Sequence, residues 1–145
     1  MDTHLTASLH ELVYTMDRFA DRVLARRFGI DRNLFAFLAP LAAGSMDVTR
    51  LAESLNLTKA AISKRVPLLE QEGWLTTSAD PDHRRRVVVT LTPRARLLVT
   101  EAGELLNDRF AALLHQTRID PERLHRQVRE LIDATRALET EPELP

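Results

Sequence analysis

Small and basic residues recur on one side of the segment Thr58–Leu75. At about 100° per residue of a helix, this side lies opposite an apolar stripe made by Ile62, Val66 and Leu69. The residues on it are Ala60, Ser63, Lys64 and Pro67. A short, basic helix face has the shape and charge to enter the major groove of DNA and approach the base edges. An ordinary surface helix has the same pattern, so the neighbouring segments decide between the two interpretations.

Three consecutive arginines, Arg84, Arg85 and Arg86, follow this helix in the sequence. They precede or begin the second of two segments, 74–78 and 86–91, that are rich in β-branched and aromatic residues. Turn residues separate the two segments at 79–82, so the pattern predicts a β-hairpin with a basic end. Arginines in such a position can lie along the phosphate backbone or enter the minor groove, where the electrostatic potential is most negative.

The elements before the basic helix complete a DNA-binding motif. Residues 48–55 predict a short helix, Asn56 and Leu57 a turn, and Thr58 the N-cap of the helix that Gly73 ends. Two helices joined by a tight turn, the second with a basic outer face, form a helix-turn-helix. A basic hairpin directly behind it is a wing.

Longer helices are predicted on both sides of this motif. Residues 5–28 carry apolar residues at alternating spacings of four and three, and Gly29 ends that helix. Asp31 caps a second helix, which Pro40 kinks or ends. Thr92-Pro93 and Asp120-Pro121 each start a further helix. The predicted fold is therefore mainly α, a winged helix-turn-helix with four helices, a hairpin wing and two more helices.

The long helices have more apolar surface than the small winged core can cover. We therefore expect a dimerisation helix at 1–30, the DNA-binding domain at 31–92, and dimerisation helices at 93–145, with both ends of the chain building a homodimer interface. Packing of the first helix against the core of its own chain is an equally good explanation of its stripe.

The overall charge is nearly balanced, but its distribution is not. The 145 residues carry a net charge of -1, which argues weakly against a nucleic-acid partner. Residues 59–96, however, hold eight Lys and Arg residues against four acids, whereas the rest holds twelve against seventeen. A basic middle in an acidic surround concentrates the attraction for phosphates on one face.

Other kinds of chemistry have little support in the sequence. The chain has no cysteine, its five histidines form no pair at i, i+4, and its four glycines form no phosphate-binding loop. No serine sits in a nucleophile elbow. We expect no enzymatic activity, no metal and no cofactor. The N-terminus resembles neither a signal peptide nor a membrane span, so a cytoplasmic location without a membrane partner is expected.

Nearly the whole chain resembles the MarR family of bacterial winged-helix regulators. The resemblance rests on the order and spacing of three motifs, which are Leu51 to Thr58, Leu68-Leu69-Glu70 with Gly73-Trp74-Leu75, and Asp80-Pro81 leading to Arg85 and Leu91-Thr92. It implies a homodimer that binds double-stranded DNA at a palindromic operator, usually as a repressor. It also implies release of the DNA when a small aromatic or lipophilic effector binds.

The resemblance places the DNA contacts of the recognition helix on Lys59, Ala60, Ser63 and Lys64, and that of the wing on Arg85. Together with the neighbouring residues, the predicted DNA-binding set is Thr58, Lys59, Ala60, Ser63, Lys64, Arg65, Arg84, Arg85 and Arg86. Aromatic residues of the first two helices lie where the family binds its effector, and Tyr14 and Phe35 are the predicted pocket residues, with core packing as the alternative.

Three positions depart from the family pattern. His83 replaces the aspartate that usually precedes the wing arginine by two residues, so the orienting acid is missing or is supplied by Asp82. Pro67 lies inside the recognition helix, where it removes the hydrogen bond to the carbonyl of Ser63. Ala95 replaces a glycine and favours the helix. Pro67 and the negative net charge motivate the alternatives, which are a winged-helix protein-interaction module or a ligand sensor without DNA binding.

Overall fold

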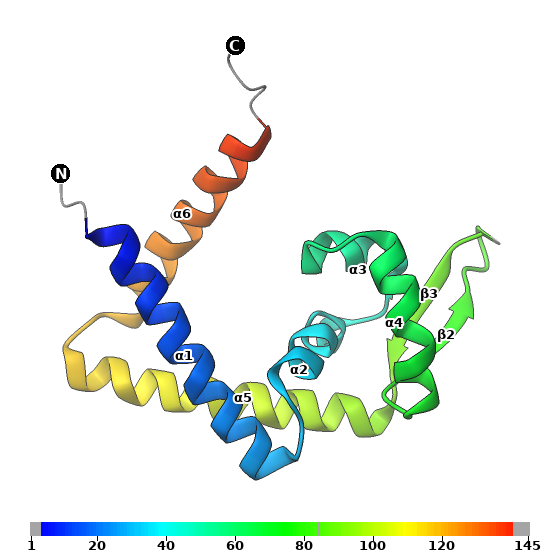
Figure 1. Ribbon diagram of the computed structural model, residues 1–145, viewed down its shortest axis with the longest axis horizontal. Helices are drawn as coiled ribbons and strands as arrows, with labels where there is room; N and C mark the ends of the chain where they lie inside the picture. The colour runs from blue at the N-terminus through cyan, green and yellow to red at the C-terminus, as the bar shows by residue number, and fades with distance from the viewer. Residues whose placement is uncertain (1–3, 84, 141–145) are drawn as a thin grey trace. The chain divides into compact units, whose positions relative to one another are not determined.

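The computed structural model describes residues 4–83 and 85–140 and is mainly helical, with one small antiparallel sheet (Figure 1). The chain forms two compact units, Met1–Leu106 and Asn107–Pro145. The first contains the helix-turn-helix and the sheet. The winged fold predicted from the sequence is confirmed.

The first two helices begin and end where the sequence predicts. Helix α1 spans Leu5–Phe28 and ends at Gly29, whose φ of 65° lies in the left-handed region that favours glycine. Helix α2 spans Arg32–Leu38, and the carboxylate of Asp31 caps it by accepting a hydrogen bond from the Leu34 N–H at 2.7 Å.

Two short elements follow α2 that the sequence analysis did not predict. A 3₁₀ helix, η1, spans Ala39–Ala43 with Pro40 near its start, and strand β1 spans Met46–Asp47. Strand β1 exists because Met46 pairs with Val89 and Asp47 with Val88, far along the chain. Two residues are too few to show a period of two, so only the tertiary pairing reveals this strand.

The helix-turn-helix consists of α3 (Val48–Leu55) and α4 (Lys59–Gln71). Asn56 forms the turn with a φ of 53°, and the Thr58 hydroxyl caps α4 by accepting from the Ala61 N–H at 3.1 Å. Ile62, Val66 and Leu69 are buried, which confirms the predicted stripe. Helix α4 continues through Pro67 without interruption.

The wing is formed by β2 (Leu75–Ala79) and β3 (Val87–Leu91), in a sheet of order β1-β3-β2. Both strands begin one residue later than predicted. Trp74 stays outside β2 because its N–H closes the end of α4 on the Leu69 carbonyl at 2.9 Å. Arg86 stays outside β3 because its N–H closes the turn on the His83 carbonyl, also at 2.9 Å.

Trp74 lies at the base of the wing between two charged residues. The Arg94 guanidinium stacks 4.1 Å from the centre of its ring, and the indole N–H donates to the Glu72 carboxylate at 3.1 Å. Arg94 also donates to the Glu72 carbonyl at 3.0 Å, so it covers an open carbonyl at the end of α4.

The core of the first unit joins every element of the winged motif. It includes Phe37 from α2, Leu51 from α3, Ile62 from α4 and Val89 from β3, none of which is more than 1% exposed. Helix α5 (Pro93–Thr117), capped by Thr92 as predicted, adds Ala95 and Val99 to it. A second cluster of Leu24, Ile30 and Ala102 packs α1 against α5.

In the second unit, helix α6 spans Pro121–Thr140 and is capped by the carboxylate of Asp120. None of its residues is buried, and Val128, Leu131 and Leu138 of its apolar stripe are 43%, 58% and 67% exposed. None of the helices in the described part of the chain has the length and apolar character needed to cross a membrane.

Candidate nucleic-acid interface

The predicted contact residues at the start of α4 share one exposed surface. Lys59, Ala60, Ser63 and Lys64 are all exposed, and no acidic residue lies in the first turn of the helix. The start of a helix carries free N–H groups and a partial positive charge, both of which attract phosphate. Thr58 is exposed too, but its hydroxyl is engaged in capping the helix.

Arg65 differs from its neighbours on α4. Its side chain is half-buried, and its guanidinium lies 4.7 Å from the centre of the Phe37 ring, a fully buried side chain of α2. This contact holds Arg65 against the hydrophobic core, whereas Lys59 and Lys64 extend into solvent. The basic surface of α4 therefore consists of the two lysines.

In the wing, Arg85 and Arg86 are exposed, and Arg84 lies outside the described residues. The Arg86 guanidinium lies 3.9 Å from the carboxylate of Asp47, the residue that caps α3. Among the described residues, Arg85 forms no ion pair. Asp80 accepts a hydrogen bond from the Asp82 N–H at 2.9 Å and so shapes the turn. Arg85 is thus the wing arginine whose charge is available to a ligand.

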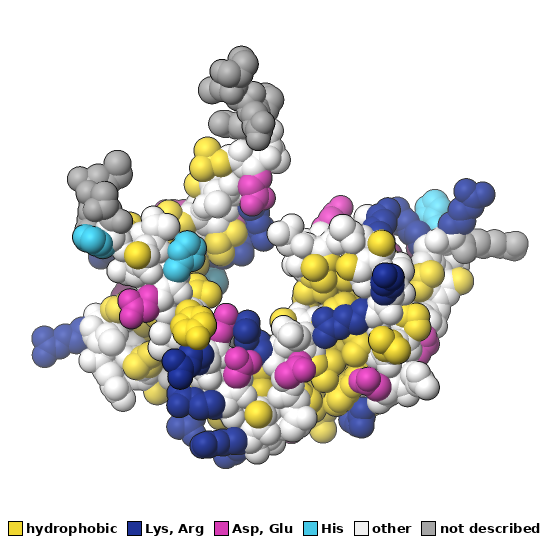
Figure 2. Space-filling model, in the orientation of Figure 1, with side chains coloured by type: hydrophobic (Ala, Val, Ile, Leu, Met, Phe, Trp, Pro, Cys, Tyr) yellow, Lys and Arg dark blue, Asp and Glu magenta, His cyan; other side chains and the backbone are white. Residues whose placement is uncertain are grey.

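The sequence analysis missed the residue that links the recognition helix to the wing. Glu70, in the last turn of α4, accepts hydrogen bonds from both the N–H and the hydroxyl of Thr77 in β2. Because the two residues belong to different elements, no helix or strand periodicity relates them. Figure 2 shows Lys and Arg side chains over α4 and over the hairpin on the face turned to the viewer, with a second group over α1.

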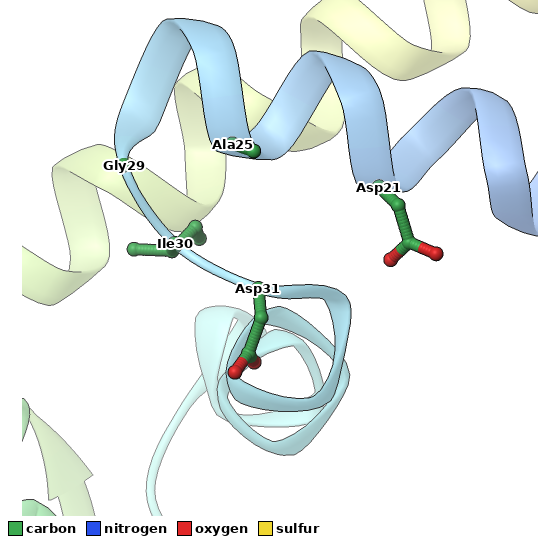
Figure 3. Close-up of a pocket in the computed structure, with 5 residues that line it drawn as sticks. All are labelled: Asp21, Ala25, Gly29, Ile30 and Asp31. Atoms are coloured by element: carbon green, nitrogen blue, oxygen red, sulfur yellow. The ribbon is translucent and has the colours of Figure 1, made fainter.

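The structure places the two predicted pocket residues in different surroundings. Tyr14 is 64% exposed on α1, with the Arg18 guanidinium 5.9 Å from its ring. Phe35 is partly buried and packs against both hydrophobic clusters. Neither lines the open pocket of about 580 Å³ in Figure 3, whose lining residues are Asp21, Ala25, Gly29, Ile30 and Asp31.

The acidic side chains of this pocket already have structural partners. Asp31 caps α2, and Asp21 accepts from Arg32 at 3.2 Å. Arg32 also lies 3.0 Å from Asp17, so the three side chains connect α1 to α2. Within residues 4–83 and 85–140, no three histidine or acidic side chains come together as a set of metal ligands.

The MarR family model matches residues 41–87, which run from η1 to the first residue of β3. This segment contains the helix-turn-helix and most of the wing. The match confirms the predicted resemblance, and it is a match to transcription regulators rather than to enzymes. No curated protein sequence matches the chain.

Solved structures of MarR-type regulators have the same fold. AbsC, a MarR family transcriptional regulator from Streptomyces coelicolor, is 18% identical with a TM-score of 0.75, and the match covers 97% of each chain. BldR, a transcriptional regulator from Sulfolobus solfataricus, is 21% identical with a TM-score of 0.74, over 90% of this chain and 94% of BldR. MepR from Staphylococcus aureus, solved in a complex with DNA, is 20% identical with a TM-score of 0.70, over 92% of this chain and 96% of MepR.

Proposed function

We propose that this chain, which carries a MarR-family segment, is a sequence-specific DNA-binding transcriptional regulator that represses as a homodimer on a palindromic operator. The observation that carries the proposal is the pairing of an exposed small and basic helix face with an adjacent basic wing. Lys59 and Lys64 supply the charge on α4, and Arg85 supplies it on the wing. The DNA complex of the structurally similar MepR supports the same use of the fold.

In this proposal the recognition helix enters the major groove and the wing lies on the adjacent backbone or minor groove. Ala60 and Ser63 are short enough for α4 to approach the base edges, and Lys64 can donate to guanine. Lys59 and Arg85 bind phosphates.

The exposed apolar stripes of α1 and α6 support the homodimer. Leu9 and Leu12 of α1 are 44% and 48% exposed, and Leu131 and Leu138 of α6 are more exposed still. Large apolar surface exposed in a monomer marks an interaction site. A two-fold dimer that covers these stripes also presents two recognition helices, which requires half-sites about 34 to 36 Å apart, or a multiple of that spacing.

We also propose that a small aromatic or lipophilic effector controls DNA binding, with Tyr14 and Phe35 as its first candidate contacts. Phe35 supports this proposal through its place between the two clusters, because a ligand that displaces it alters the packing of α2 against α1 and α5. Effector-induced loss of a mobility shift, abolished by Phe35→Ala, tests this part.

A footprint on DNA upstream of the protein's own gene, followed by affinity measurements over a range of salt concentrations, tests DNA binding. Arg85→Ala should weaken binding to every sequence and reduce the slope of the salt dependence by about one, because one fewer phosphate is neutralised in each protomer. The matched control is Arg126→Ala, an exposed arginine on the polar side of α6, which should change neither quantity.

Absence of any shift would favour a protein-interaction module or a ligand sensor instead. Unchanged affinity and unchanged salt dependence in Arg85→Ala would remove the wing from the interface while leaving α4 in it.

A further inference from the structure

The recognition helix and the wing are joined by one carboxylate. Glu70 Oε1 accepts from the Thr77 N–H at 3.1 Å, and the Thr77 hydroxyl lies 3.0 Å from Oε1 and 3.1 Å from Oε2. Hydrogen bonds to an ionised carboxylate are roughly twice as strong as those between neutral groups. One side chain of α4 therefore binds both the backbone and the side chain of the same residue in β2.

This contact uses a backbone group that the sheet leaves open. In the order β1-β3-β2, β2 is an edge strand whose outward N–H groups have no strand partner. The Thr77 N–H turns outward to Glu70, although Thr77 itself pairs in register with Val89. The carboxylate therefore acts on the middle of β2, between the base of the hairpin and its tip.

The opposite edge of the wing is also held by the helix-turn-helix. Strand β1 pairs with β3, and the hydroxyls of Ser45 and Thr90 are hydrogen-bonded at 2.7 Å. Asp47, which caps α3, lies 3.9 Å from the Arg86 guanidinium. The Glu70–Thr77 contact on one edge and these contacts on the other restrict the hairpin from both sides.

We propose that Glu70 is a positioning residue for DNA binding, which fixes the direction of the wing relative to α4 so that Lys64 and Arg85 engage the same stretch of DNA together. This inference rests on the proposed function. A wing without the Glu70–Thr77 clamp samples more directions, and ordering it on DNA costs conformational entropy. The contribution of Arg85 to affinity then decreases, while the interactions of α4 with DNA remain.

Charge alone predicts the opposite result. Replacing Glu70 by Gln removes a negative charge from a DNA-binding protein, which by simple electrostatics should strengthen binding to phosphates. Removal of the clamp should weaken it. The sign of the change therefore separates the two effects, and Glu53→Gln, at an exposed position on α3, is the matched control for the charge.

The experiment is a double-mutant cycle on an operator defined by footprinting. Affinities are measured for the wild type, Glu70→Gln, Arg85→Ala and the double variant, below the unfolding temperature of all four. We expect Glu70→Gln to weaken binding, and the decrease in affinity caused by Arg85→Ala to shrink by roughly threefold or more in its background. Glu53→Gln should bind at least as tightly as the wild type.

Thr77 provides a second test of the clamp. Thr77→Ser keeps the hydroxyl and should bind like the wild type, whereas Thr77→Val keeps the shape of the side chain and should weaken binding. In the Glu70→Gln variant, footprint protection by the wing should disappear while protection at the base edges under α4 is retained.

The outcomes distinguish this inference from the proposed function. A wild type that binds no DNA overturns the proposed function. A wild type that binds, with additive effects of Glu70→Gln and Arg85→Ala or with tighter binding of Glu70→Gln, overturns the clamp alone.

Discussion

Neighbouring basic residues of the same helix have different environments. Lys64 extends into solvent, whereas Arg65 stacks on the Phe37 ring at 4.7 Å. The sequence analysis placed both in the DNA-binding set, because side-chain charge shows no difference between them. Phe37 belongs to another helix, so only the tertiary fold reveals the interaction. The two lysines and Arg85, in contrast, are exposed as the sequence led us to expect.

We predict that Lys64→Ala and Arg65→Ala separate DNA binding from stability. Lys64→Ala should change base preference and weaken operator binding while leaving the melting temperature unchanged, because its side chain packs on nothing buried. Arg65→Ala should lower the stability by about 0.5 to 1 kcal/mol, because the cation–π interaction with Phe37 is removed. Thermal denaturation and selection of binding sites from random DNA measure the two effects. Equal melting temperatures for both variants would contradict the assignment.

At the scale of elements, the caps and breaks of the sequence were the reliable signals. Gly29, Asp31 and Thr58 each end or cap a helix as predicted. Local chemistry determines such boundaries, so a local pattern predicts them. Elements η1 and β1 escaped prediction because η1 is a single tight turn and β1 depends on pairing with distant β3.

The Glu70–Thr77 contact escaped prediction for the same reason. The sequence places Glu70 in a helix and Thr77 in a strand, but their approach depends on how α4 and β2 pack together.

Gly103 inside α5 provides a test at this scale. A Cβ built at this position meets nothing within 4 Å, so no close packing in the described structure requires a glycine. We predict that Gly103→Ala stabilises the protein by up to about 1 kcal/mol, because alanine loses less backbone entropy in a helix. Chemical denaturation followed by circular dichroism measures the change.

Gly29→Ala is the matched control for this variant. Gly29 has open space as well, but its φ of +65° strains an alanine, so this variant should be destabilised. Destabilisation by Gly103→Ala would mean that a second chain packs closely against α5 at this point.

At the scale of the whole molecule, exposed apolar stripes are the main feature that one chain leaves unexplained. The sequence showed both stripes, and the structure shows Leu9 of α1 and Leu131 of α6 exposed. Neither establishes the partner, because a monomer structure contains only one half of a symmetric interface.

We predict that Leu131→Glu prevents dimerisation and thereby weakens operator binding by more than roughly tenfold, since one half-site alone then provides the affinity. A charge placed in an apolar interface loses its hydration without gaining a partner. Sedimentation analysis measures the oligomeric state, and circular dichroism verifies the helices. Arg126→Glu, on the polar side of the same helix, should remain dimeric; a dimeric Leu131→Glu would move the interface away from α6.

The single tryptophan of the chain gives the molecule a natural optical probe. Trp74 stands where α4 passes into β2, between the Arg94 guanidinium and the Glu72 carboxylate. Any motion of the hairpin against the helix changes the charges beside the indole, and with them the colour and intensity of its fluorescence. Titration of the unlabelled protein with an oligonucleotide therefore reports directly on the base of the wing.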